Sequence, residues 1–143
     1  IAELTARSDS DDVPVGQLGE FVYEPDGAVI RARLIGDLGR SIGATMLSDA
    51  IAWLSSDSAV DTPFATRFRV VESLPYDVKA LKRLVAARGI GTLEIKKRGV
   101  DVDPAELRKK LNPNGDAAAT LILTRVAGRH TALLTERETT GNS

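Results

Sequence analysis

The sequence contains no cysteine and is poor in histidine and aromatic residues. Its 143 residues include one His, one Trp, two Tyr and three Phe. Without cysteine there can be no disulfide, no thiolate catalysis and no zinc or iron-sulfur site with Cys ligands. So few aromatic rings provide little surface for stacking the bases of a single-stranded nucleic acid.

Long apolar runs and secretory signals are also missing. No stretch approaches the roughly 18 apolar residues of a membrane helix, so we expect a cytoplasmic protein with no membrane partner. A hydrophobic content of 43% in 143 residues is enough for one or two small cores. The chain begins at Ile1 rather than Met, and we expect it to be part of a longer protein.

The net charge of −1 conceals an uneven distribution. Residues 1–26 carry one basic residue against seven carboxylates, whereas residues 79–110 carry ten Lys and Arg against four carboxylates. This asymmetry is typical of a surface that faces a polyanion. Charged helix faces that are merely solvated give the same composition, so charge alone leaves both interpretations open.

The segment from Leu74 to Gly99 has the most regular pattern in the chain. Asp77 can cap a helix whose apolar residues recur at helical spacing, and Gly89 is a C-terminal stop signal. Lys79, Lys82, Arg83 and Ala86 fall on the other side of this helix. From Thr92 the period changes to two, which predicts a strand ending in Lys96, Lys97 and Arg98.

The remaining elements extend this pattern into an α+β fold. A strand is predicted over 64–72, and a helix capped by Asp103 with Pro104 in its first position runs to Leu111. Strands over 118–126 and 129–136 join through a tight turn at Ala127-Gly128. The order strand, helix, strand, helix, strand, strand predicts a mixed sheet with helices on one face.

We expect a helical N-terminal segment before this sheet. Asp26 can cap a helix that carries Ile30, Leu34 and Leu38 and ends near Gly39 or Gly43. The expected organisation is the end of an upstream domain, with a strand over 1–7, and a linker; then a helical connecting segment; an α+β domain; and a disordered tail. Their respective ranges are 1–18, 19–63, 64–137 and 138–143.

Three phrases of the sequence point to a known family. They are Leu74-Pro75-Tyr76, the run GIGTLEIKKRG over 89–99, and YEPDGAVIRA over 23–32. Together they resemble the THUMP-like C-terminal domain of bacterial class I S-adenosylmethionine-dependent methyltransferases, over roughly Gly19 to Arg137. The resemblance implies an accessory domain beside its own catalytic, Rossmann-like domain, which lies upstream and binds S-adenosylmethionine in the parent protein.

Catalytic machinery is not evident within the chain. His130 is the only histidine, and no nucleophile or carboxylate is marked as its partner. The glycines of Gly89-Ile90-Gly91 lack the third glycine and the helix of a dinucleotide-binding loop. Glu24-Pro25-Asp26 could shape a cleft against the catalytic domain, but we favour a helix start, because capping alone explains these residue types. We therefore expect this chain to be non-catalytic, with no cofactor or metal of its own.

Three functions remain open. The preferred hypothesis is a domain that positions a nucleic-acid substrate, most plausibly RNA, through phosphate contacts. The second is a scaffolding module that packs on the catalytic domain or on a second subunit, and the third is a regulatory site for a small anion near Asp77 or Asp103. Trp53 could stack a base, but a core position is the commoner use of a single tryptophan. The predicted phosphate-contacting residues are Lys79, Lys82, Arg83, Arg88, Lys96, Lys97 and Arg98.

Overall fold

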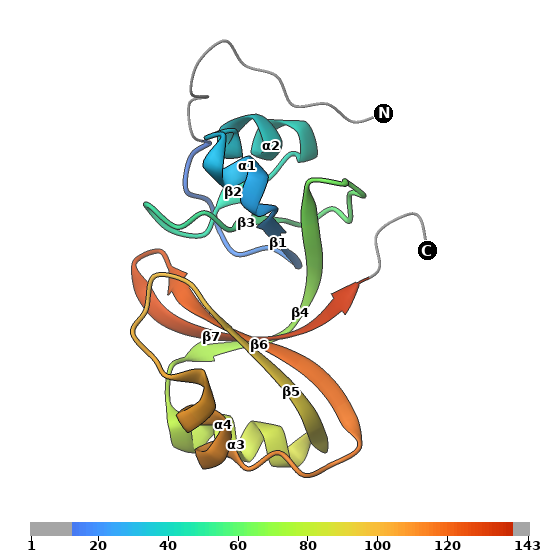
Figure 1. Ribbon diagram of the computed structural model, residues 1–143, viewed down its shortest axis with the longest axis vertical. Coiled ribbons are helices and arrows are strands. Elements are labelled where there is room, and N and C mark those ends of the chain that lie inside the picture. The colour runs from blue at the N-terminus through green and yellow to red at the C-terminus, as the bar shows by residue number, and fades with distance from the viewer. Residues whose placement is uncertain (1–12, 139–143) are drawn as a thin grey trace. The chain divides into compact units, whose positions relative to one another are not determined.

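The computed structural model describes residues 13–138, which form seven strands and four helices (Figure 1). The strand expected over 1–7 and the tail expected after residue 138 lie outside the described residues. All seven strands belong to a mixed sheet with the order β2-β3-β1-β4-β7-β6-β5, which confirms the predicted fold class. The elements are β1 (Phe21–Pro25), α1 (Gly27–Arg31), α2 (Ile35–Ile42), β2 (Thr45–Met46), β3 (Leu54–Ser56), β4 (Ala65–Pro75), α3 (Val78–Ala87), β5 (Ile90–Lys97), α4 (Pro104–Leu111), β6 (Ala117–Val126) and β7 (Arg129–Glu138).

The chain divides into two compact units. The first comprises the described residues up to Arg69 together with 137–138, and the second comprises Val70–Glu136. Each unit has a separate hydrophobic core. No helix within residues 13–138 has both the length and the apolar character needed to cross a bilayer.

The second unit is built as the sequence predicts. The Asp77 side chain accepts hydrogen bonds from the amides of Lys79 and Ala80 and so begins α3. The Asp103 side chain caps α4 in the same way, with Pro104 in the first turn. The sequence places Glu106 three residues after Asp103, where a capping box is predicted, but the Glu106 carboxylate does not form that bond and lies 3.6 Å from Lys110.

Both helices of this unit contribute to one core on one face of its strands. Leu81 of α3 and Leu107 of α4 share a buried cluster with Leu93, Leu121 and Leu134 of the sheet. β5 pairs with β6 in parallel, and β6 pairs with β7 in antiparallel. Because α4 connects the two adjacent parallel strands, it supplies the crossover of a βαβ unit.

Two glycines allow a close backbone contact at the start of β5. A Cβ atom on Gly91 would lie 1.7 Å from the carbonyl oxygen of Gly115, and a Cβ on Gly115 would lie 2.0 Å from that of Gly89. The Gly115 amide donates to Ile90 O, and the Ala117 amide donates to Gly89 O. The glycines of this motif therefore serve backbone packing between β5 and the segment that leads into β6.

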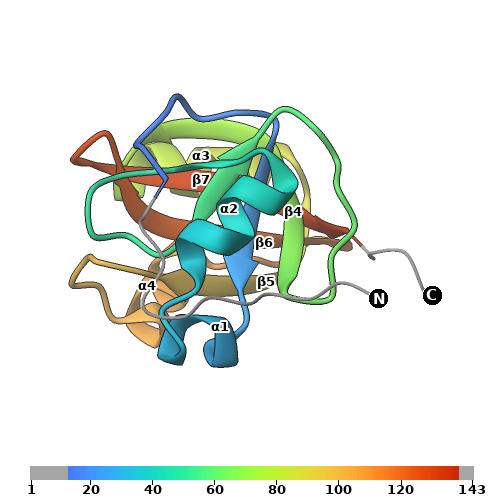
Figure 2. The ribbon, with the colours of Figure 1, turned by 90° about the horizontal axis from the view of Figure 1, so that it is seen from above.

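The first unit departs from the predicted single helix. α1 ends after five residues, because Ala32 closes it and Arg33 adopts a left-handed φ of 58°. The Arg33 amide donates to Ile30 O and the Leu34 amide to Val29 O, which is the Schellman pattern of a helix end. The chain then starts α2, which ends at the expected Gly43, and Figure 2 shows α1 and α2 as separate helices.

Asp26 precedes α1 but does not cap it with its side chain. Its backbone amide instead donates to Phe64 O at 2.8 Å, in the loop before β4. The segment predicted to be helical also contains β2, which the sequence pattern did not indicate.

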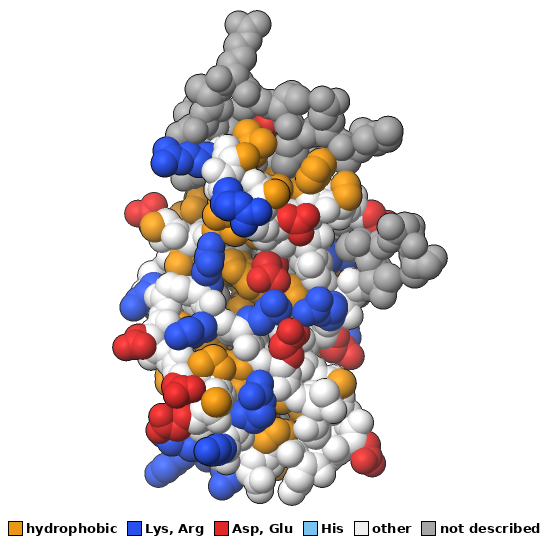
Figure 3. Space-filling model, in the orientation of Figure 1, with side chains coloured by type: hydrophobic (Ala, Val, Ile, Leu, Met, Phe, Trp, Pro, Cys, Tyr) orange, Lys and Arg blue, Asp and Glu red, His pale blue; other side chains and the backbone are white. Residues whose placement is uncertain are grey.

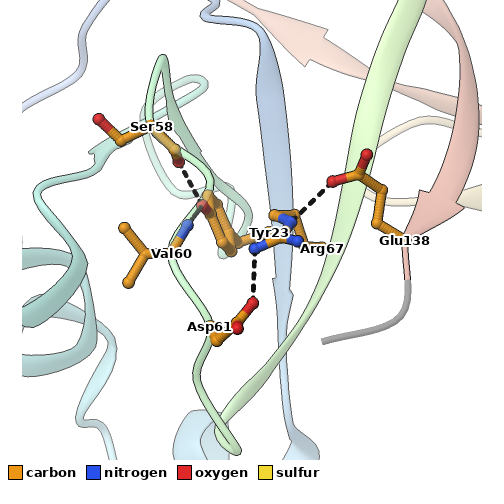
Figure 4. Close-up of polar contacts among 6 residues, drawn as sticks. All are labelled: Tyr23, Ser58, Val60, Asp61, Arg67 and Glu138. Atoms are coloured by element: carbon orange, nitrogen blue, oxygen red, sulfur yellow. Dashed lines mark hydrogen bonds and ion pairs between the residues drawn. The ribbon is translucent and has the colours of Figure 1, made fainter. Parts of the chain in front are cut away.

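Buried polar side chains fix the loop between β3 and β4 (Figure 4). The fully buried Tyr23 donates its hydroxyl hydrogen to Ser58 O at 2.5 Å and accepts from the Val60 amide at 2.9 Å. Arg67, whose side chain is only 10% exposed, donates to Asp61 at 2.9 Å and to Glu138 at 2.8 Å. Its guanidinium carbon also lies 5.7 Å from the centre of the Phe21 ring.

β5 forms one edge of the sheet. On the side of β5 that faces away from β6, Arg108 of α4 donates a hydrogen bond from Nε to Leu93 O at 3.2 Å. One backbone carbonyl of this edge is therefore hydrogen-bonded to a positively charged side chain.

Candidate nucleic-acid interface

The second unit carries the positive charge of the chain. Val70–Glu136 contains twelve Lys and Arg against eight Asp and Glu, whereas residues 13–69 contain five against seven. All twelve basic side chains are exposed except Lys96, which is partly buried. On the face shown in Figure 3, Lys and Arg side chains are interleaved with Asp and Glu rather than gathered into one continuous patch. Local grouping and pairing therefore decide which cations can meet a polyanion.

α3 presents three of the predicted residues to solvent. Leu81 and Val85 bury one side of this helix, which leaves Lys79, Lys82 and Arg83 exposed on the other side. Within residues 13–138 none of these three cations has a polar side-chain partner.

Two further predicted residues are engaged within the chain. Arg88, at the end of α3, lies 3.5 Å from Glu72. Lys96 is partly buried and takes part in a polar interaction. These two are less available to a phosphate than the cations of α3.

Lys97 and Arg98 lie where β5 ends and are exposed. The alternation predicted for this strand is confirmed, because Leu93 and Ile95 are buried in the helix-covered core while Glu94 is exposed. The Arg98 amide donates to Leu123 O at 3.0 Å, so this end of β5 is held against β6.

Sequence reasoning missed two arginines at the same end of the sheet. Arg125 lies near the end of β6 and Arg129 begins β7, on either side of the Ala127-Gly128 turn. The predicted hairpin placed both residues beside a turn, but it did not reveal that β5 pairs with β6 and so ends beside them. Lys109 is also exposed on α4, outside the predicted set.

The aromatic residues offer no open stacking surface. Trp53 is 3% exposed and stacks on Phe68 with ring centres 5.8 Å apart, which confirms its core position. Tyr76 stacks on His130 with ring centres 4.3 Å apart. Val15 is the one large hydrophobic residue that is exposed within residues 13–138. Without exposed aromatic rings, contacts to a nucleic acid would be made to its backbone rather than by base stacking.

A pocket of about 220 Å³ lies in the second unit between the Tyr76–His130 pair and the start of α4. His130 Nε2 is buried without a hydrogen-bond partner among the described residues. Among residues 13–138 no carboxylate or hydroxyl is hydrogen-bonded to this imidazole. Nor do three or more metal-ligating side chains meet anywhere in residues 13–138. The lining of the pocket includes Asp101, Asp103, Glu106 and Lys110.

The helix starts suggested for a small anion are already occupied. The Asp77 and Asp103 carboxylates accept from the first-turn amides of α3 and α4. An anion would have to displace a carboxylate of its own charge at either position.

The His130 side chain is expected to make stability depend on pH. Burial, followed by the charge of Arg125, lowers the pKa of His130 from its ordinary value of 6.5. The carboxylates of Asp101, Asp103 and Glu106 and the ammonium of Lys110 line the same pocket. Below pH 6.5 the unfolded chain then binds a proton that the folded chain does not, so the free energy of unfolding falls as the pH drops from 6.5 toward the lowered pKa.

Urea unfolding of the wild type and of His130→Gln, measured from about pH 5 to pH 8, checks this prediction. The stability difference between the two proteins is expected to change across the acid half of the range and to level off above pH 6.5. Titration of other groups cancels in the difference. Parallel curves for the two proteins would show that the imidazole is not disfavoured as a cation in the folded state.

The comparisons with known proteins identify the family of the chain. The family model for the THUMP domain-like family matches residues 65–137. The chain is 36% identical over 124 residues to uncharacterized S-adenosylmethionine-dependent methyltransferases of two strains of Mycobacterium tuberculosis. That match covers 87% of this chain but 34% of the relatives, so the chain spans about a third of their length.

A solved structure shows the same fold. The crystal structure of a putative methyltransferase from Porphyromonas gingivalis superposes with a TM-score of 0.75 and 23% identity, over 90% of this chain and 32% of that one. The family match covers β4 through most of β7, including every cation of the second unit described above. The chain therefore belongs to the THUMP domain-like family.

Proposed function

We propose that this chain is an accessory domain of an S-adenosylmethionine-dependent methyltransferase, and that it positions an RNA substrate for a catalytic domain elsewhere in the same protein. The methyltransferase part is supported by the curated relatives, in which about two-thirds of the length lies outside the match. That length is ample for a catalytic domain of the usual size.

The observation that carries the RNA part is the set of exposed cations without partners in the second unit. Lys79, Lys82, Arg83, Lys97, Arg98, Lys109 and Arg129 have no polar side-chain partner among the described residues. A cation that is not neutralised within the protein can release counterions from a nucleic-acid backbone when it binds. Phosphate contacts of this kind orient a nucleic acid without reading its sequence.

S-adenosylmethionine is assigned to the catalytic part of the parent. Of the glycines that resemble part of a nucleotide loop, Gly91 does not fit the close backbone approach that such a loop needs. Gly91 lies inside β5, and the space beside it is filled by the Gly115 backbone. A phosphate or ribose cannot approach the backbone there.

Salt-dependent binding of transfer RNA tests the proposal. We expect fluorescence anisotropy to show an affinity that falls steeply between about 50 and 200 mM salt. The triple variant Lys96→Glu, Lys97→Glu, Arg98→Glu is expected to bind at least about tenfold more weakly, because it removes three cations and adds repulsion. Far-UV circular dichroism serves as the folding control for the variant.

Two results would contradict the RNA assignment. One is a wild-type dissociation constant weaker than about 100 μM at low salt, the weak end of ordinary non-specific association. The other is an affinity that salt does not change. Either result would favour a scaffolding module whose cations are only solvated.

A further inference from the structure

We propose that the principal phosphate-contacting surface of this chain is the end of the sheet where β5 stops and β6 turns into β7, rather than the exposed face of α3. We call this surface the strand-end cluster, and it comprises Lys97, Arg98, Arg125 and Arg129. The inference rests on the proposed RNA function and specifies the residues that serve it. Two of the four residues, Arg125 and Arg129, belong to no motif in the sequence.

Backbone pairing brings the cluster together from three strands. Arg98 follows β5, and its amide donates to Leu123 O of β6 at 3.0 Å. Its carbonyl accepts from Thr124 Oγ1 at 2.9 Å. On the other side of β6, Arg129 of β7 is paired with Val126. Residues more than thirty positions apart in the sequence are thus brought together by the pairing of β5, β6 and β7.

Arg125 fixes the two loops that carry the other cations. Its Nε donates to Gly99 O at 3.1 Å, and its Nη1 donates to Gly128 O at 3.2 Å. Gly99 and Gly128 both have left-handed φ angles, of 76° and 79°. One guanidinium therefore joins the turn after β5 to the hairpin turn, and this positioning role lowers the ordering cost when a phosphate binds.

The spacing suits consecutive phosphates. Neighbouring strands lie about 4.8 Å apart, so side chains on β5 and β7 are separated by about 10 Å across β6. That width exceeds the separation of two neighbouring phosphates on one strand, so the cluster can contact more than one phosphate. Three of the four side chains are arginines, whose planar guanidinium can donate two hydrogen bonds to one phosphate.

α3 lacks these features. Two of its three exposed cations, Lys79 and Lys82, are lysines, which bind a phosphate as a point charge rather than through a planar pair of donors. Arg88 at the far end of the helix is already beside Glu72.

The surrounding charges set the direction of approach. Asp101, Asp103 and Glu106 line the pocket at the start of α4 and would repel a phosphate. By strand alternation Arg98 and Arg129 lie on the face opposite the helix-covered core, whereas Lys97 and Arg125 lie on the same face as that core. A nucleic-acid backbone would therefore approach the strand-end cluster at the ends of the strands, away from the pocket at the start of α4.

A matched pair of triple variants tests this inference. The strand-end variant carries Lys97→Gln, Arg98→Gln and Arg129→Gln, and the α3 variant carries Lys79→Gln, Lys82→Gln and Arg83→Gln. Both lose three positive charges from exposed side chains without partners among the described residues, so neither is expected to change folding. The probe is a fluorescein-labelled RNA hairpin with a duplex stem, titrated at several salt concentrations.

We expect the strand-end variant to lower the magnitude of the log K against log salt slope by about 2 to 3, and to weaken binding about 10- to 100-fold at low salt. The α3 variant is expected to keep the wild-type slope to within about 0.5. Equal losses in the two variants, or a loss confined to the α3 variant, would overturn this inference while leaving the RNA function in place. No salt-dependent binding by the wild type would instead remove the proposed function itself.

Arg125 has a separate readout as a positioning residue. Arg125→Gln is expected to weaken RNA binding and also to raise amide hydrogen exchange in the turns at Gly99 and Gly128, where its guanidinium now donates. The strand-end variant is expected to leave exchange at both turns unchanged. Unchanged exchange in Arg125→Gln would show that this guanidinium does not hold the turns.

Discussion

Replacing Gly91 with alanine is expected to lower the free energy of unfolding of the second unit by at least about 3 kcal/mol, the upper part of the range for overpacked sites. The new Cβ would lie 1.7 Å from the Gly115 carbonyl oxygen, so β5 or the segment before β6 would have to move. Both are backbone, and the Gly115–Ile90 and Ala117–Gly89 hydrogen bonds hold them in register. Urea unfolding followed by far-UV circular dichroism measures the loss.

Gly89 provides the matched control, only two residues away. It has a φ of +63°, and no atom lies within 4 Å of a Cβ built on it. Asparagine tolerates that conformation, so Gly89→Asn is expected to cost less than about 1 kcal/mol. Hydrogen exchange at the Leu93 and Leu121 amides should show the damage of Gly91→Ala in the second unit. Similar costs for the two variants would mean that the close approach at Gly91 is not a constraint.

Removing both carboxylates beside Arg67 is expected to destabilise the first unit more than removing the arginine itself. The Arg67 side chain is 10% exposed, whereas the Asp61 and Glu138 side chains are 57% and 29% exposed. Burial works to lower the pKa of Arg67, but the hydrogen bonds and charges of Glu138 and Asp61 outweigh it and raise that pKa. The guanidinium thus stays charged, and without these partners it would be a largely buried, unpaired cation.

We expect Asp61→Asn combined with Glu138→Gln to cost about 2 to 3 kcal/mol, because hydrogen bonds to a charged group are replaced by weaker ones. Arg67→Met keeps most of the packing against Phe21 and leaves carboxylates that water can reach, so about 1 kcal/mol is expected. Unfolding monitored by Trp53 fluorescence reports on this unit. A larger loss for Arg67→Met than for the double variant would refute the prediction that losing both carboxylates costs more than losing the arginine.

Elements with local chemical signals were predictable from the sequence. Asp77, Asp103 and Pro104 mark helix starts through side chains that satisfy adjacent amides, and the structure shows those contacts. Ala127-Gly128 marks the hairpin, because the turn needs two residues with left-handed φ angles, here 51° and 79°. Each of these signals acts within four residues, so it can be identified from the sequence without knowledge of the tertiary fold.

Features set by distant contacts were not predictable. Arg33 ends α1 in a conformation that usually takes glycine, so no residue type marked the break. The Asp26 side chain makes no cap bond, and the Asp26 amide donates to Phe64 O, far along the chain. A role for Glu24 or Asp26 in a cleft against the catalytic domain of the parent stays a prediction.

The candidate site shows the same division. Lys79, Lys82 and Arg83 could be placed on a solvent-facing side from helical periodicity alone. The convergence of Arg98, Arg125 and Arg129 depends on the parallel pairing of β5 with β6, which joins residues that no local pattern connects. Which cations are neutralised within the chain, as Arg88 is by Glu72, depends likewise on tertiary geometry.

The bond from Arg108 to Leu93 has a bearing on self-association. A β-strand at the border of a sheet is a template on which a second molecule can add, and growth of that kind leads to fibrils. Here the border strand is β5, and the Arg108 guanidinium donates to its Leu93 carbonyl oxygen. Lys96 and Lys97 add positive charge at the end of the same strand. Two copies would have to desolvate and expel these cations before they could join edge to edge, which favours a dispersed chain at high concentration.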